Sequence, residues 1–266
     1  MPAIGRLRYL EALPRGSDRP RGTLLLIHGF PLNARMWESQ LALADHGWRV
    51  LAPQLRGVDG GDRDPPTSSI DDYAGDVIDL LDALHIHEAV IGGLSMGGYV
   101  TLAMFGLAPR YFLGMILADT RPQADTPEAL TARRRMQQLV REKGAWAVAD
   151  EMLPKFLTDT TRRDRADLVE QVRGLILSNS TASIAGAIDA LMSRPDSTPL
   201  LSTIHCPTLV LVGEEDSLTP RVLSEDMHRA IAGSELIVVS AAAHLSNIEQ
   251  PADFNEALAR FLRHRV

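Results

Sequence analysis

The sequence predicts an α/β fold, with a mostly parallel central sheet flanked by helices and a helical insertion in the middle of the chain. Three observations lead to this prediction. Short apolar runs alternate with longer amphipathic stretches, as in βαβ units. Runs such as 24–27 and 209–212 are apolar at every position, which is typical of strands buried on both faces. The alternation stops between residues 126 and 192, where only helical spacing is found.

The expected strands follow one another at intervals that leave room for a helix between them. A strand or hairpin arm is expected at 4–12, and further strands at 23–27, 48–52, 89–94, 112–118, 207–213 and 235–239. Asn33 is expected to cap a short helix after the second of these, and Ser69 or Asp71 to open the next helix. A loop rich in Gly and Asp is expected at 56–66.

The insertion is predicted to form a cap over the carboxyl edge of the sheet. Four helical runs fill it, at 127–143, 145–156, 164–177 and 181–193. The chain therefore divides into a core of residues 1–120 and 196–266 and a cap of residues 121–195.

Composition excludes several classes of function. The 266 residues carry a net charge of −7, which argues against a nucleic-acid partner. Cys206 is the single cysteine, so an intrachain disulfide is excluded. The N-terminal segment lacks the apolar stretch of a signal peptide, and no run approaches the roughly 20 apolar residues of a membrane span. We expect a cytoplasmic protein without a membrane partner, and its oligomeric state stays open.

The stretch around Ser95 points to nucleophilic chemistry. A strand-like run leads into Gly93-Leu94-Ser95-Met96-Gly97, and a helix-like run follows. In this context G-x-S-x-G is a nucleophile elbow, in which a strained turn exposes the serine and the glycines let strand and helix approach closely. Ser95 is the candidate nucleophile, and the Met96 N–H is placed to stabilise an oxyanion. The alternative is a turn that only joins a strand to a helix.

A serine hydroxyl needs a base and a group that orients the base. Asp216 follows one of the last two expected strands, and His244 follows the other. In folds that carry such an elbow, the three residues follow one another along the chain in the order Ser, Asp, His, as they do here. We therefore assign His244 as general base and Asp216 as its hydrogen-bond acceptor. Asp119, after an earlier strand, is the alternative acid.

A pocket is expected next to these residues. The Phe30 N–H is the second candidate oxyanion donor, because Gly29 lets the backbone approach closely. The expected pocket residues are His28, Gly29, Phe30, Leu94, Trp146 and Leu218. His28 itself is expected to be a structural histidine bonded to backbone. The arginines at 133–135 fit a solvated helix face, with an anion-reading role for one of them as the alternative.

Neither a metal nor an organic cofactor is expected. His85 and His87 form an H-x-H pair without a third ligand nearby in the sequence. The glycines at 92, 93 and 97 lack the G-x-G-x-x-G spacing of a dinucleotide-binding turn.

Four segments together resemble the α/β-hydrolase superfamily, from about residue 22 to residue 263. They are His28-Gly29-Phe30-Pro31 with Trp37, the elbow with Gly98, Gly213 to Pro220, and Ala243 to Pro251. The last of these and Ala118-Asp119-Thr120-Arg121 are similar to the branch of 3-oxoadipate enol-lactonases and small carboxylesterases. Two departures are Gln54, where relatives carry Asp before Leu-Arg-Gly, and Ala243, where a glycine often precedes the histidine.

The residues and the resemblance lead to one expected function and two alternatives. The first is a serine hydrolase that cleaves small to medium carboxylic esters through an acyl-enzyme. The second is a 3-oxoadipate enol-lactonase or a related lactonase. The third is a ligand-binding protein on the same fold, because fold alone does not determine function. The natural substrate stays open.

Overall fold

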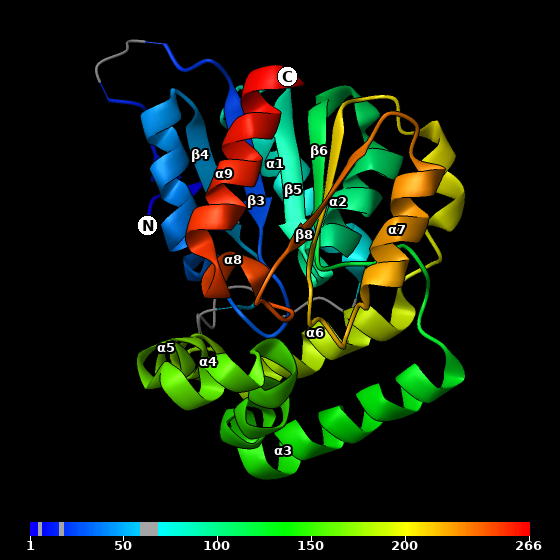
Figure 1. The fold of residues 1–266 in the computed structure, drawn as a ribbon. Coiled ribbons are helices and arrows are strands. Elements are labelled where there is room, and N and C mark those ends of the chain that lie inside the picture. The colour runs from blue at the N-terminus through cyan, green and yellow to red at the C-terminus, as the bar shows by residue number, and fades with distance from the viewer. Residues whose placement is uncertain (5–6, 16–18, 59–68) are drawn as a thin grey trace.

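A mostly parallel sheet forms the centre of the molecule (Figure 1). The computed structural model describes residues 1–4, 7–15, 19–58 and 69–266, and the loop expected at 56–66 lies outside this part from residue 59 onward. Within the described residues the sheet has eight strands, in the order β1-β2-β4-β3-β5-β6-β7-β8. The strands are β1 (Ala3–Ile4), β2 (Leu7–Ala12), β3 (Thr23–Ile27), β4 (Arg49–Gln54), β5 (Ala89–Leu94), β6 (Phe112–Ala118), β7 (Thr208–Gly213) and β8 (Glu235–Val239).

Strand direction follows the predicted βαβ pattern. The pairs from β4 through β8 are parallel, and only the β1–β2 and β2–β4 pairs are antiparallel. Every residue of β3, β5 and β7 is buried, because helices cover both faces of the sheet. The predicted α/β fold class is therefore confirmed.

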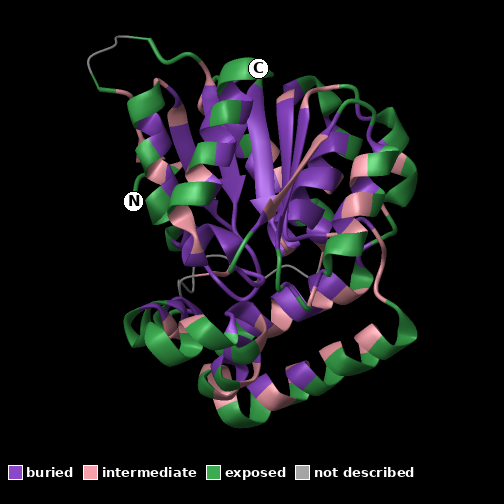
Figure 2. Cartoon of the chain, viewed as in Figure 1, coloured by how far each residue is buried: buried purple, intermediate pink, exposed green. Residues whose placement is uncertain are grey.

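Helices pack on the sheet through apolar faces, which appear in purple in Figure 2. The helices are η1 (Ala34–His46), α1 (Ile70–Ala83), α2 (Met96–Leu107), η2 (Pro109–Tyr111), η3 (Thr198–Thr203), α7 (Arg221–Ala230), α8 (Ser246–Glu249) and α9 (Pro251–His264). Trp37 of η1 is fully buried and its ring lies 6.0 Å from that of Phe254 of α9, which joins these two helices. Asn33 caps η1 as predicted by accepting the Arg35 N–H at 2.9 Å, although η1 is a 3₁₀ helix.

Four helices between β6 and β7 lie together beyond the carboxyl ends of the strands (Figure 1). We call them the cap helices: α3 (Pro127–Phe156), α4 (Asp159–Asp164), α5 (Ala166–Leu177) and α6 (Thr181–Ser193). Gly144 interrupts α3 with a φ of 74°, so α3 consists of the two arms that the sequence predicts. The short α4 was not expected as a separate helix. The division of the chain at residues 121 and 195 stays a prediction.

The described helices are short or polar by the standard of a membrane span. In the part of the chain that the structure describes, no single helix is long and apolar enough to cross a bilayer. Among the described helices, α5 and α6 together have the length and composition of a span, but the chain bends by 87° between them.

Candidate active site

The elbow holds Ser95 between β5 and α2. Its φ of 56° lies in the left-handed region, which non-glycine residues rarely adopt. A Cβ on Gly97 would lie 2.0 Å from the Ile27 carbonyl oxygen, and one on Gly93 would lie 2.2 Å from the Gly97 backbone. Both positions therefore require glycine. The turn expected from the sequence is present, and its strain is stored at the candidate nucleophile.

Asp216 is fixed by the turn that follows β7. One carboxylate oxygen accepts the N–H groups of Leu218 and Thr219 at 2.8 and 3.0 Å. The other oxygen accepts the Thr219 hydroxyl at 2.5 Å and a hydrogen bond from His244 Nδ1 at 2.8 Å. Burial alone would raise the pKa of Asp216, but the charge of His244 and these hydrogen bonds lower it to about 2. Asp216 is therefore ionised and aimed at the imidazole.

His244 is 2% exposed and lies against Phe156 of α3. The two rings are stacked, with centroids 5.7 Å apart and planes 13° from parallel. Burial opposes the charged imidazolium, but the charge of Asp216 and its hydrogen bond outweigh burial and raise the pKa of His244. The hydrogen bond to Asp216 occupies Nδ1, which leaves Nε2 for proton transfer.

The loops that carry Asp216 and His244 cross at Gly213. A Cβ on Gly213 would lie 2.0 Å from the Ala243 carbonyl oxygen. Backbone hydrogen bonds of 2.9 Å join Glu214 to Val239 and Glu215 to Ala242. This close crossing brings two segments together that are far apart in sequence.

Asp119 has a different role from Asp216. Its carboxylate accepts the Gly213 N–H at 2.8 Å and the Ser246 hydroxyl at 2.5 Å, and it is fully buried. Burial and the nearby charge of Asp216 raise the pKa of Asp119 to about 8. Asp119 joins the end of β7 to the helix after His244, whereas Asp216 contacts the imidazole.

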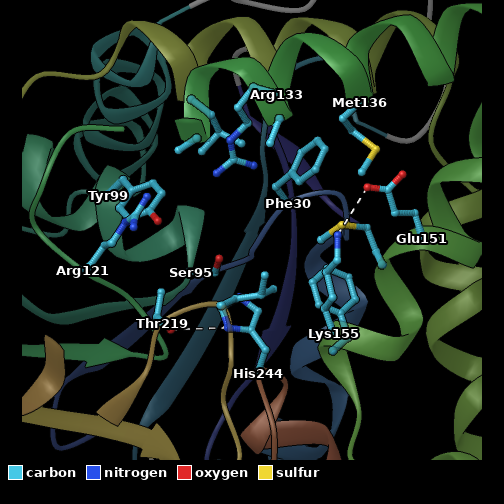
Figure 3. A pocket seen from close by; sticks show the side chains of 16 residues that line it. Phe30, Ser95, Tyr99, Arg121, Arg133, Met136, Glu151, Lys155, Thr219 and His244 are labelled. Atoms are coloured by element: carbon cyan, nitrogen blue, oxygen red, sulfur yellow. Dashed lines mark hydrogen bonds and ion pairs between the residues drawn. The ribbon is translucent and has the colours of Figure 1, made fainter. Parts of the chain in front are cut away.

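A cavity of about 260 Å³ opens above Ser95 and His244, which lie beside each other in Figure 3. Its apolar lining includes Phe30, Tyr99, Met136, Met152, Phe156, Leu191 and Leu218. Its charged lining residues are Arg121, Arg133, Glu151 and Lys155. The cap helices supply most of this lining, so they shape the space above the candidate nucleophile.

The structure corrects part of the expected pocket. Phe30 and Leu218 line the cavity. Trp146 does not, because it lies on the outside of α3, is 60% exposed and packs under the Arg173 guanidinium at 5.3 Å. Leu94 is fully buried beneath the elbow. Helical spacing in the sequence indicated the cap helices, but not which of their side chains face the cavity.

His28 and Gly29 lie behind the cavity and line only a smaller void next to it. The Leu55 N–H donates to His28 Nε2 at 3.1 Å, so the proton is on Nδ1, which donates to the Gly29 carbonyl at 3.2 Å. Burial lowers the pKa of His28 to about 4. His28 is thus the neutral structural histidine that the sequence analysis favoured.

One candidate oxyanion donor, Met96, belongs to the elbow, and the other, Phe30, lies in the loop after β3. Met96 is the first residue of α2, where backbone N–H groups lack intrahelical partners. Phe30 follows Gly29, whose Cβ position would lie only 3.1 Å from the Leu94 carbonyl oxygen. The loop after β3 thus approaches the elbow closely. The assignment of these two N–H groups stays a prediction.

Glu249 is a buried residue that the sequence analysis did not single out. One carboxylate oxygen accepts the Thr158 N–H at 2.9 Å, and the other accepts the Ala243 N–H at 2.6 Å. The Leu245 N–H also donates to the Phe156 carbonyl at 3.1 Å. These contacts join the cap helices to the loop that holds the candidate base. The only signal in the sequence was its place five residues after His244.

No metal site is found among the described residues, because no three His, Cys, Asp or Glu side chains come together in a way that could hold an ion. A nucleophile elbow after a central parallel strand, with an acid and a histidine on later loops, defines the α/β hydrolases as a class. The sequence agrees, since residues 24–257 match the model of the alpha/beta hydrolase family. The chain belongs to that family, as the resemblance implied.

Known relatives include esterases and enol-lactonases. The chain is 30% identical over 247 residues to 3-oxoadipate enol-lactonase 2 of Acinetobacter baylyi, covering 93% of this chain and 90% of that protein. A thermophilic esterase from Thermogutta terrifontis, solved with malate bound, superposes with a TM-score of 0.90 at 36% identity, over 97% of this chain and 93% of that one. The enol-lactonase of Burkholderia xenovorans superposes with a TM-score of 0.87 at 26% identity, over 97% and 96% of the two chains.

Proposed function

We propose that this hydrolase cleaves carboxylic esters of small to medium size through an acyl-enzyme on Ser95. The observation that carries the proposal is the 2.8 Å contact between Asp216 and His244, beside a serine held in a strained elbow. An ionised carboxylate on one imidazole nitrogen leaves the other nitrogen as a base for the serine.

In the proposed mechanism, His244 Nε2 takes the proton of Ser95 Oγ as Oγ bonds to the ester carbonyl carbon. The N–H groups of Phe30 and Met96 stabilise the negative charge on the carbonyl oxygen. His244 then gives the proton to the alcohol oxygen as the carbon–oxygen bond breaks. A water molecule then gives a proton to His244 and attacks the acyl carbon. His244 returns this proton to Ser95 Oγ as the bond between Oγ and the acyl carbon breaks, which releases the acid. Asp216 holds the Nδ1–H tautomer and stabilises the imidazolium in both steps.

A lactonase is the second candidate, favoured by the match to 3-oxoadipate enol-lactonase 2 over most of both chains. The same bond is broken, but acid and alcohol remain in one product molecule. A binding protein without catalysis is the non-enzymatic alternative, and the arrangement of Ser95, Asp216 and His244 supports catalysis instead.

The decisive experiment compares the protein with its Ser95→Ala variant on p-nitrophenyl acetate, butyrate and a long-chain ester, and on 3-oxoadipate enol-lactone. Loss of the nucleophile is expected to lower the rate on esters by on the order of a million-fold. Turnover of the lactone alone would select the second candidate. Equal rates for the two proteins on every substrate would reject the catalytic proposal.

A further inference from the structure

The cavity wall carries more positive than negative charge. Lys155 Nζ lies 3.3 Å from Glu151, and these two charges balance. Three arginines surround the single carboxylate of Asp125, namely Arg121, Arg133 and Arg194. The Asp125 side chain is fully buried, and the guanidinium of Arg194 together with the charge of Arg133 outweighs burial and lowers its pKa. One ionised carboxylate among three guanidinium groups leaves a net charge of about +2 beside a largely apolar cavity.

Of the three arginines, Arg133 has its guanidinium directed into the cavity above Ser95. It stands on α3, and its Nε donates to Asp125 at 3.2 Å, which fixes the direction of the guanidinium. Figure 3 shows the guanidinium directed into the cavity. Its two terminal nitrogens form no hydrogen bond with any residue that the structure describes, and the side chain is 24% exposed. Its charge also lowers the pKa of His244, which places it within electrostatic reach of the candidate base.

The other two arginines hold this arrangement in place. Arg121 donates to Asp125 at 2.8 Å and lines the cavity beside Tyr99, while its Nε is buried without a partner among the described residues. Arg194 is 3% exposed, bonds to Asp125 at 2.8 Å and stacks on the Tyr99 ring at 4.1 Å. A buried cation is costly unless it is paired. Here three guanidinium groups share the single carboxylate of Asp125, so one carboxylate does not balance their charge. An anion delivered by the substrate would supply a second negative charge.

We propose that the cavity binds a carboxylate carried by the substrate, held by the terminal nitrogens of Arg133 with Arg121 behind it. The preferred substrates are then esters that carry a carboxylate in addition to the scissile group. This inference rests on the proposed function, because the bound molecule is taken to be an ester that Ser95 cleaves. A guanidinium presents two parallel N–H groups that match the geometry of a carboxylate, and such bonds are about twice as strong as neutral ones.

The test uses pairs of esters that differ only in this charge. Monoethyl glutarate is compared with ethyl 5-methylhexanoate, in which an isopropyl group replaces the carboxylate. The second pair, 4-carboxyphenyl butyrate and 4-isopropylphenyl butyrate, places the charge on the alcohol side. Hydrolysis is followed in a pH-stat, and each pair gives a ratio of kcat/KM for the charged over the neutral ester.

Arg133→Gln is expected to lower this ratio by about 10- to 100-fold for at least one pair, the range that a hydrogen bond to a charged group commonly contributes. The pair that responds identifies the side of the ester that carries the carboxylate. The matched control is Arg134→Gln, because Arg134 is the exposed neighbour on the same helix and does not line the cavity. Its ratios are expected to stay unchanged. In Arg133→Gln the carboxylate of Asp125 still pairs with Arg121 and Arg194, so it is not left buried without a partner. If Arg133→Gln does not fold, Arg133→Met takes its place.

Two results would overturn the inference. If Ser95→Ala abolishes ester hydrolysis but Arg133→Gln leaves both ratios unchanged, the proposed function stands and the carboxylate site is rejected. If no ester is hydrolysed, the proposed function fails, and calorimetry of monoethyl glutarate with Ser95→Ala decides the site by itself. Binding that Arg133→Gln weakens in that background supports the site. Absent binding, or binding that does not depend on Arg133, rejects it.

Discussion

Asp216 accepts four hydrogen bonds with one buried carboxylate, and only one of them comes from His244. The other three come from Leu218 and Thr219, so the carboxylate cannot turn away from the imidazole. Asp119 lies in the same region but bonds to Gly213 and Ser246. Two acids that sequence reasoning left as alternatives are thus separated by their hydrogen-bond partners.

The two acids are expected to respond differently to amide substitution. Asp216→Asn is expected to lower kcat for ester hydrolysis by about 10⁴-fold, because the amide favours the wrong imidazole tautomer. Asp119→Asn is expected to lower kcat by less than about tenfold, because this substitution removes roughly one hydrogen bond. Steady-state kinetics on p-nitrophenyl butyrate measure both. A larger loss for Asp119→Asn would reverse the assignment.

The raised pKa of His244 predicts the pH dependence of activity. The base must be neutral to accept the serine proton, so kcat/KM is expected to rise with pH through a midpoint above the ordinary histidine value of 6.5. The same shift stabilises the folded protein below pH 6.5, and this contribution is lost as pH rises through the folded pKa. A pH–rate profile on p-nitrophenyl butyrate gives the midpoint. A midpoint below 6.5 would contradict the prediction.

At the scale of single elements, close backbone contacts position the site. The elbow brings α2 against the end of β3, with the Gly97 Cβ position overlapping the Ile27 carbonyl. The last two loops cross at Gly213 with the same tightness. Glu249 adds a side-chain connection from the candidate base's loop to the cap helices.

Alanine at the elbow is therefore expected to destabilise the fold. Gly97→Ala should lower the free energy of unfolding by about 3 kcal/mol, at the upper end of the cost of overpacking, because backbone must move. Gly75→Ala in α1 is the matched control, since nothing lies within 4 Å of its Cβ position. It should raise the free energy of unfolding by about 0.5–1 kcal/mol through helix propensity. Urea unfolding compares the two, and a neutral Gly97→Ala would contradict the steric account.

Glu249→Gln tests the connection between the cap helices and the His244 loop. A carboxylate accepts both buried N–H groups, whereas an amide turns one donor toward another donor. The expected loss is about 1–3 kcal/mol of unfolding free energy, the cost of leaving a buried group unpaired. Glu256→Gln, on the exposed face of α9, is the control and should change stability by less than about 0.5 kcal/mol. Equal effects of the two variants would mean that the buried contacts of Glu249 add nothing.

At the scale of the whole molecule, the order of the strands assembles the site. The elbow follows β5 at the centre of the sheet, and Asp216 and His244 follow β7 and β8 at one side. Because parallel strands end at the same edge, three distant segments meet at the edge that faces the cap helices (Figure 1). The cap helices then close the cavity from above and bring Arg133 and Phe156 to it.

The order of Ser95, Asp216 and His244 along the chain made them candidates, with Asp119 as the alternative acid. The sequence by itself determined the α/β class, the parallel strands, the helical insertion and the glycine-lined turn around Ser95. Apolar periodicity and glycine spacing are local, and they determine these features directly. Only the tertiary structure decided that Trp146 faces outward, that Arg133 faces the cavity and that Glu249 joins two segments. Those outcomes depend on how helices are rotated and packed, and packing is set by contacts between residues far apart in sequence.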